Sequence, residues 1–289
     1  MAATSQGVEP DALGVVPAPA SLAEQNPGPP PAPDWKGLLE AVAAIPQVSI
    51  NAETFIKVWP SASRPVAVKC ADGNTYVIKG SNAGRQVVND CIAAQLGLLL
   101  RAPVPPSALI TIPEELRLAT PEMSHLAPGV SHGSRVMEDC TEREAFAHCE
   151  AGDNRQRFAS VAILYGWLGA NDRQFIYGKN PPYRVYSVDH GHFFGPGNPD
   201  WTVASLSAAA PAVTDHETVT ACALTNEQLV TACGPLHEVT AEQIAAAVGF
   251  VPQGWLITID EQVALCAYLE KRRMELTKTH PKATLGTGG

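Results

Sequence analysis

Asp72-Gly73-Asn74-Thr75-Tyr76-Val77-Ile78-Lys79 is the most informative stretch of this chain. Residues 66–69 and residues 75–79 are short runs rich in β-branched and other apolar side chains. Asp-Gly between two such runs favours a tight hairpin turn, because glycine readily adopts the positive φ that the turn requires. The sequence therefore predicts an antiparallel strand pair whose second strand ends at Lys79.

A helix and further short strands are expected around this hairpin. Residues 86–100 carry apolar side chains at about the helical period, and the prolines at 103, 105 and 106 prevent the helix from continuing. Residues 35–44 are also predicted to be helical, and residues 108–112 and 116–119 are predicted to be strands. The first half of the chain is therefore expected to form a small α+β lobe.

The second half is expected to be more helical. Phe158, Val161, Ala162, Tyr165 and Leu168 have helical spacing, and the glycine that follows is expected to end this helix. Two strands are predicted at 175–177 and 184–188, and two more helices at 241–248 and 260–276. Residues 202–213 are expected to be irregular or a short helix.

The two ends of the chain have a different composition. Residues 1–34 contain eight prolines and seven alanines but few large apolar side chains. Such a segment buries too little apolar surface to offset its ordering entropy, so we expect a disordered tail. Residues 281–289 are expected to be a flexible C-terminus.

The overall charge limits the partners of the chain. It has 20 Lys+Arg against 29 Asp+Glu, a formal net charge of −9. Binding to phosphate backbones or anionic membranes needs cationic side chains, so neither direct nucleic-acid binding nor membrane binding is expected. No cation precedes Lys36, so no secretory signal is predicted. The seven scattered cysteines lack a CxxC pair and favour free thiols in a reducing compartment, which predicts a cytoplasmic protein.

Several polar residues follow one another in an order that suits phosphoryl transfer. Ser61 and Ser63 precede the hairpin among small residues, which let backbone N–H groups approach a phosphate. Lys79 ends the second strand, and Asp90 lies in the first turns of the next predicted helix. Phosphoryl transfer from ATP needs a strand lysine on the phosphates and a helix acid that orients it.

Two further acids complete the pattern in the second half. Asp172 comes just after a predicted helix end, and Asp189 ends a predicted strand. A kinase needs one such acid as the base for the acceptor hydroxyl and another to hold Mg²⁺. His190 and His192 next to Asp189 would suit a zinc site only with further ligands, and none is evident at that spacing.

These motifs, in this order, resemble the HipA-like kinase domain, a branch of the protein-kinase-like fold related to the phosphoinositide kinases. The resemblance covers about residues 48–276. The pieces that carry it are residues 72–79, 88–90, 96–97, 103–105, 133–135, 169–174 and 189–193.

The resemblance implies an α+β, bilobal protein-kinase-like fold, with a small β-rich N-lobe at residues 35–125 and a larger, mainly helical C-lobe at residues 126–280. It implies a kinase that transfers the γ-phosphate of Mg-ATP to a Ser or Thr hydroxyl of a protein, or of the chain itself. A regulatory partner protein is also compatible with it.

The same resemblance assigns roles by position. Lys79 would bind the ATP phosphates, Asp90 would pair with Lys79, Asp172 would be the catalytic base, and Asp189 would bind the metal. Ser61 and Ser63 would lie in the loop that covers the phosphates, where phosphorylation of either serine would repel ATP.

The chain departs from the family pattern at two positions. Asp90 is one methylene shorter than the usual glutamate, so its pair with Lys79 is expected to be longer or bridged by water. Tyr177 stands where many kinases carry an asparagine metal ligand, and Gln174 offers a hard oxygen that would replace it. A silent pseudokinase that binds nucleotide or protein, and a lipid or small-molecule kinase of the same fold, stay open as alternatives.

Overall fold

The computed structural model describes residues 31–61, 63–80, 83–142, 146–196 and 199–282. Contacts within Asp34–Gly289 form one compact unit. Nearly all of the expected tail at 1–34 and of the expected flexible end at 281–289 lies outside the described residues, so both stay predictions.

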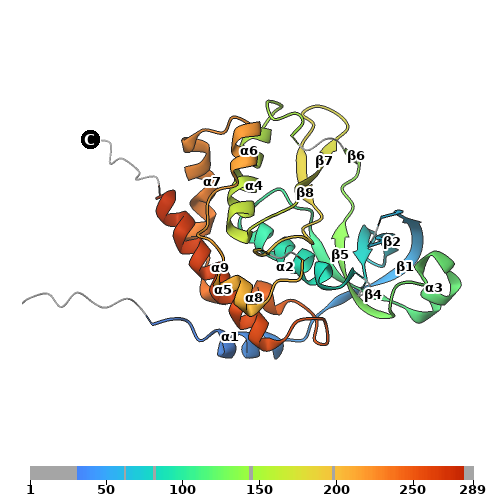
Figure 1. The fold of residues 1–289 in the computed structure, drawn as a ribbon. Helices are drawn as coiled ribbons and strands as arrows, with labels where there is room; N and C mark the ends of the chain where they lie inside the picture. The colour runs from blue at the N-terminus through green and yellow to red at the C-terminus, as the bar shows by residue number, and fades with distance from the viewer. Residues whose placement is uncertain (1–30, 62, 81–82, 143–145, 197–198, 283–289) are drawn as a thin grey trace, which may run out of the picture. The chain divides into compact units, whose positions relative to one another are not determined.

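In the described part of the chain, five strands close a barrel in the order β1-β2-β3-β5-β4 (Figure 1). They are β1 (Ser49–Val58), β2 (Val66–Cys70), β3 (Thr75–Lys79), β4 (Ser107–Ile112) and β5 (Gly129–Arg135). Neighbouring strands are antiparallel, except that β1 and β4 are parallel. The barrel takes β5 from beyond residue 125, where the sequence places the end of the N-lobe, and the lobe boundaries stay a prediction.

The hairpin predicted from the Asp-Gly turn is present as β2 and β3. Gly73 has a φ of 80°, and its N–H donates to the carbonyl of Cys70 over 2.9 Å. Val68 and Ile78 are fully buried in the barrel interior. Because side chains alternate along a strand, Val77 and Lys79 lie together on the outer face of the barrel.

A three-stranded sheet and most of the helices make up the remainder. The sheet has the order β6-β7-β8, with β6 (Cys140–Glu142), β7 (Gln174–Gly178) and β8 (Val185–Val188). The helices are α1 (Trp35–Ala43), α2 (Arg85–Leu99), α3 (Glu114–Ala119), η2 (Pro121–Met123), α4 (Asn154–Leu168), α5 (Val203–Ser207), α6 (His216–Ala221), α7 (Asn226–Glu238), α8 (Ala241–Gly249) and α9 (Ile259–Thr279).

The larger hydrophobic core surrounds α4. Phe158, Tyr165 and Trp167 of this helix are almost completely buried, among side chains of α2, α7, α8 and α9. Gly169 ends α4 with a φ of 72°, as the sequence predicts. The chain then enters β7 directly, which places residue 172 on a short connection between two well-packed elements.

Most elements predicted from the sequence are confirmed, with two corrections. Residues 116–119 are predicted as a strand but belong to α3, because Pro113 precedes two first-turn acids and Glu114 pairs with Arg117 over 2.7 Å. The expectation of free thiols is wrong for Cys149 and Cys222, which form a disulfide.

No helix of the described residues combines the length and the apolar composition that crossing a membrane requires.

Candidate active site

Lys79 lies between two carboxylates. Its Nζ is 3.0 Å from Oδ2 of Asp90 and 2.5 Å from Oδ1 of Asp189. The side chains of Lys79 and Asp90 are almost completely buried, whereas that of Asp189 is 33% exposed. The structure thus brings together three residues that are separated by up to 110 positions in the sequence.

Burial and pairing act in opposite directions on these charges. Burial disfavours the ammonium of Lys79, but the adjacent carboxylates of Asp90 and Asp189 outweigh it and raise the lysine pKa. Burial likewise disfavours the carboxylate of Asp90, but the Lys79 ammonium and the hydrogen bond from His190 hold its pKa well below the usual value. Lys79 and Asp90 therefore stay charged at neutral pH.

The pair between Lys79 and Asp90 is direct, so the expected longer or water-bridged contact is wrong. Asp90 lies in α2, which packs close to the end of β3, and its Oδ2 reaches the lysine without a bridge. Its Oδ1 accepts from the backbone N–H of His190 over 3.0 Å. The shorter side chain thus connects the lysine to the residue that follows Asp189.

The backbone at Asp189 explains how the chain reaches both partners. Asp189 has a φ of 57°, a left-handed conformation that aspartate adopts more readily than most residues. The chain turns directly after β8, so the carboxylate of Asp189 meets Lys79 while the next N–H meets Asp90.

Asp172 and Asp189 leave the same end of one hairpin. Gln174 of β7 is paired with Val188 of β8, so the residues just before β7 and just after β8 lie at the same end of the sheet. The N–H of Asn171 also donates to the carbonyl of His192 over 3.3 Å. The hairpin therefore brings the predicted base and the predicted metal ligand to one side of the molecule.

A cavity of about 270 Å³ opens on the barrel face that carries Lys79. Ala67 of β2, which lines the cavity, is paired with Lys57 of β1 and with Val77 of β3. Val77 is two residues before Lys79, so Ala67 and Lys79 lie on the same face of the barrel. The cavity is lined by Ile56, Lys57, Trp59, Ala67, Asn74, Thr75, Val136 and Glu138. It extends from the first three strands to the segment that follows β5.

Comparison of the sequence with family models matches residues 53–187 to the HipA-like kinases. The resemblance drawn from the motifs is confirmed, and the matched segment includes Lys79, Asp90 and Asp172 and ends two residues before Asp189. No curated protein sequence matches the chain.

Solved structures of kinases have a similar fold. A proinflammatory kinase of Helicobacter pylori, CtkA, is 11% identical and superposes with a TM-score of 0.54, over 81% of this chain and 97% of that chain. The Golgi casein kinase is similar at a lower level. With Mn/ADP bound it is 11% identical over 86% of this chain and 76% of that chain, with a TM-score of 0.43. A second structure of it is 12% identical over 84% and 76%, with a TM-score of 0.42. The similarity to CtkA shows a kinase-like fold, and the family match supports a kinase.

The phosphate-covering loop expected for a HipA-like kinase is the connection from β1 to β2. Val66, the first residue of β2, pairs with Ile78, so this connection lies at the end of the barrel where Lys79 stands. Ser61 is exposed and Ser63 is half-buried. Their assignment to a phosphate site stays a prediction.

Gln174 and Tyr177 both belong to β7, but Gln174 is exposed and Tyr177 is buried. Nε2 of Gln174 donates to Oδ2 of Asp172 over 2.7 Å, so these two side chains share one face, as their spacing predicts. Tyr177 is completely buried in the core, and its hydroxyl accepts from the N–H of Ala147 over 3.1 Å. Tyr177, where the sequence resemblance predicts the asparagine ligand of many kinases, is therefore a core residue.

Two buried histidines lie near the lysine, and sequence reasoning missed the first of them, His132. His132 of β5 is opposite Lys79, and neither of its ring nitrogens has a hydrogen-bond partner among the described residues. Burial lowers its pKa to about 4, so it is neutral beside the lysine at neutral pH. His190 bonds through Nε2 to the hydroxyl of Ser187 over 2.8 Å. No group of three metal-ligating residues is found in the described part of the chain.

Arg173 anchors the connection between α4 and β7 to α6. Its guanidinium bonds to both carboxylate oxygens of Asp215, with Nε at 3.1 Å, and Nη1 is 3.0 Å from Glu217. Asp215 also caps α6 through the N–H and hydroxyl of Thr218. The residue next to Asp172 is thus fixed by a nearly buried ion pair.

Replacing Asp215 with alanine is expected to lower the free energy of unfolding by about 3 kcal/mol at neutral pH, because the change leaves Arg173 without its buried partner and removes a helix cap. Asp153→Ala is the control. Asp153 is half-exposed, and its ion pair with Arg184 is long, at 3.7 Å, so Asp153→Ala should lower the free energy of unfolding by less than about 1 kcal/mol. Urea unfolding measures both.

The effect of Asp215→Ala should disappear in acid. Burial opposes ionisation of Asp215, but the bonds from Arg173 and Thr218 outweigh it and hold its pKa below 3.8. A lowered folded-state pKa gives stability that is present above the unfolded-state pKa and lost as the pH falls through the folded-state value. An effect that stays constant from pH 7 to about pH 3 would contradict this assignment.

Proposed function

We propose that this chain is a kinase that transfers the γ-phosphate of Mg-ATP to a Ser or Thr hydroxyl of a protein, including its own. The observation that carries the proposal is the position of Lys79 Nζ, within 3.0 Å of Asp90 and 2.5 Å of Asp189. A buried lysine that is oriented by a helix acid, beside a second acid near solvent, is the arrangement that a phosphate and its metal require.

The nucleotide would bind along the outer face of the barrel. Its base would enter the 270 Å³ cavity, and its phosphates would extend toward Lys79 on the same face. The loop with Ser61 and Ser63 would cover the phosphates, since backbone N–H groups of small residues approach phosphate oxygens closely. The ammonium of Lys79 would neutralise phosphate charge in a site with little water.

The residues at the end of the β7-β8 hairpin would carry the chemistry. The carboxylate of Asp172 would orient the acceptor hydroxyl and take its proton, and Arg173 would keep this carboxylate in place. Asp189 and the amide oxygen of Gln174 are oxygen donors of the kind that Mg²⁺ prefers, so the residues fit this metal. The metal would neutralise charge on the transferred phosphoryl group.

A pseudokinase that binds nucleotide or protein is the alternative that a specific residue favours. Tyr177 lies in the core and supplies no oxygen to the site in the way an asparagine ligand would. A lipid or small-molecule acceptor is the other alternative.

The cytoplasmic location predicted from the sequence stays a prediction. The Cys149–Cys222 disulfide argues against it, since disulfides are more typical of an oxidising compartment.

Nucleotide binding tests the proposal first. ATP should raise the melting temperature of the wild type, and Mg²⁺ should increase this stabilisation, because a ligand that binds only the folded state stabilises it. Lys79→Met should remove the effect of ATP, and Asp189→Asn should remove the additional effect of Mg²⁺. A melting temperature that does not respond to ATP, with or without Mg²⁺, would contradict the proposal.

Gln174→Ala is expected to raise the Mg²⁺ concentration needed for half-maximal phosphoryl transfer by about tenfold, because the metal loses an oxygen ligand. The KM for ATP at saturating Mg²⁺ should change little. Gln253→Ala is the control, since Gln253 is exposed in a turn away from the site. If Gln174→Ala titrates with Mg²⁺ like the wild type, Gln174 is no ligand.

A further inference from the structure

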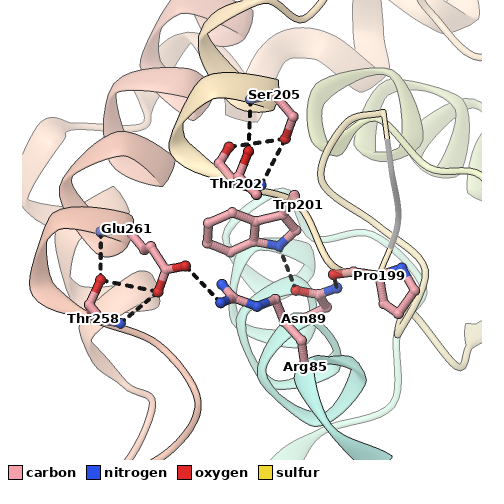
Figure 2. Close-up of polar contacts among 8 residues, drawn as sticks. All are labelled: Arg85, Asn89, Pro199, Trp201, Thr202, Ser205, Thr258 and Glu261. Carbon is pink, nitrogen blue, oxygen red and sulfur yellow. Dashed lines mark hydrogen bonds and ion pairs between the residues drawn. The ribbon is translucent and has the colours of Figure 1, made fainter.

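Asn89 of α2 holds both ends of the segment that follows Asp189. Its Nδ2 donates to the carbonyls of Gly191 over 2.8 Å, Phe193 over 3.4 Å and Pro199 over 3.2 Å. Its Oδ1 accepts from the indole N–H of Trp201 over 2.9 Å. Figure 2 shows the amide of Asn89 between Pro199 on one side and the Trp201 ring on the other.

A side-chain amide suits this set of partners, because it carries two N–H donors, which the three carbonyls share, and one oxygen acceptor. The backbone carbonyls need a donor, and the indole N–H needs an acceptor, so the contacts also fix the orientation of the amide. Asn89 and Trp201 are almost completely buried, so water cannot readily take the place of a hydrogen bond that is lost between them. A buried polar group that loses its partner costs more than the bond contributed in the folded protein.

A second residue of α2 holds the same segment. Arg85 precedes Asn89 by four positions and therefore shares its helix face. Its guanidinium lies 4.5 Å from the ring centroid of Trp201, and Nη2 is 2.7 Å from Oε1 of Glu261. Glu261 is part of the capping box with Thr258 that begins α9 (Figure 2). Trp201 is thus fixed between α2 and a residue that α9 anchors.

Asn89 stands next to Asp90, and the two side chains act on neighbouring parts of the chain. Asp90 binds Lys79 and accepts from the backbone N–H of His190. Asn89 donates to the carbonyl of Gly191, which follows His190 in the chain. One turn of α2 therefore holds the lysine and the start of the segment that Asp189 begins. A shift of this segment away from Asn89 would move Asp189 relative to Lys79.

We propose that Asn89 is a positioning residue for phosphoryl transfer. By holding residues 191, 193, 199 and 201 on α2, it keeps the carboxylate of Asp189 beside Lys79, where the metal is required. This role rests on the proposed kinase function, but the contacts that carry it do not. Loss of Asn89 should weaken the use of Mg²⁺ more than it weakens ATP binding, because Lys79 keeps its own partner Asp90.

The test compares Asn89→Ala with Asn154→Ala in the full chain. Asn154 is a matched control: it is equally buried, and its amide also bonds to backbone groups, at His148, Tyr183 and Val185. It holds the start of β8, at the other end of the hairpin from Asp189. Trp201→Phe is a second variant, in case Asn89→Ala does not fold; it removes the five-membered ring of the indole together with the N–H that bonds to Asn89.

Two measurements are made on each variant: hydrogen–deuterium exchange, and turnover as a function of Mg²⁺. Asn89→Ala should speed amide exchange in residues 190–201 by about tenfold or more and raise the Mg²⁺ concentration for half-maximal turnover by a similar factor, as expected from about 1.4 kcal/mol of lost interaction. Trp201→Phe should show the same changes at smaller size. Asn154→Ala should leave both quantities near wild type.

An Asn89→Ala protein with the Mg²⁺ dependence of Asn154→Ala would overturn the proposal, since Asn89 would then be an ordinary core contact. If the wild type transfers no phosphate, the proposed function fails and the exchange data decide the question for Asn89. Faster exchange confined to residues 190–201 would support the positioning role, and exchange equal to wild type would overturn it.

Discussion

Lys79→Met should lower phosphoryl transfer by about a hundredfold to a thousandfold, and Asp189→Asn by a similar factor. Lys79 is the cation on the outer barrel face that Asp90 and Asp189 orient, and no other lysine among the described residues has two carboxylate partners. Asp189→Asn keeps the shape of the side chain but removes the charge that holds the metal. Initial rates of ADP formation at saturating Mg-ATP measure both effects.

Both variants should still fold, although Lys79→Met removes the cation beside the buried carboxylate of Asp90 and should lower the free energy of unfolding. In Lys79→Met the carboxylate of Asp90 keeps the N–H of His190, and in Asp189→Asn the altered side chain is already one third exposed. Circular dichroism checks the fold, and Lys69→Met on the exposed side of β2 is the control. Near wild-type turnover in either variant would show that the role given to that residue is wrong.

Asp172→Asn should bind Mg-ATP like the wild type but transfer phosphate about 10²–10⁴-fold more slowly. The change keeps the bond from the Arg173 N–H, which is 2.8 Å from the side chain, but removes the acceptor for the hydroxyl proton. Because Asp172 lies at the hairpin end and not on the barrel face, nucleotide affinity should not depend on it. Calorimetric titration with Mg-ATP and single-turnover transfer separate the two effects.

Asp153→Asn is the control for this change, since Asp153 is an exposed acid at the other end of α4. If Asp172→Asn lost nucleotide affinity and turnover by the same factor, Asp172 would belong to the nucleotide site and not to the acceptor site.

Local signals made much of the fold predictable. The Asp-Gly turn, the prolines after α2 and the glycine after α4 each act within a few residues, so their elements were found with nearly correct ends. The run at 116–119 is ambiguous because two leucines around Arg117 alternate like a strand, and four residues are too few to show a helical period. β5, with the sequence GVSHGSR, has little apolar pattern, and it is a strand because β3 and β4 pair with it on both sides.

The site was predictable by type of residue but not by contact. Lys79, Asp90, Asp172 and Asp189 stand out because each lies at or near the end of an element, in the order that the resemblance to kinases implies. The partners of Asn89 lie more than 100 positions away and are mostly backbone carbonyls, which have no sequence signature. The same holds for His132, which meets Lys79 only through strand pairing.

Incubation with γ-labelled ATP and Mg²⁺, alone and with a cell extract, followed by mass spectrometry of the labelled residues, tests the kinase assignment most directly. The proposal predicts phosphate on Ser or Thr side chains of a protein in the wild-type reaction and at least about a hundredfold less in the Lys79→Met reaction. Mg-ATP binding without label on any acceptor would contradict it and establish a pseudokinase, and label on lipid or small molecules alone would contradict the protein acceptor.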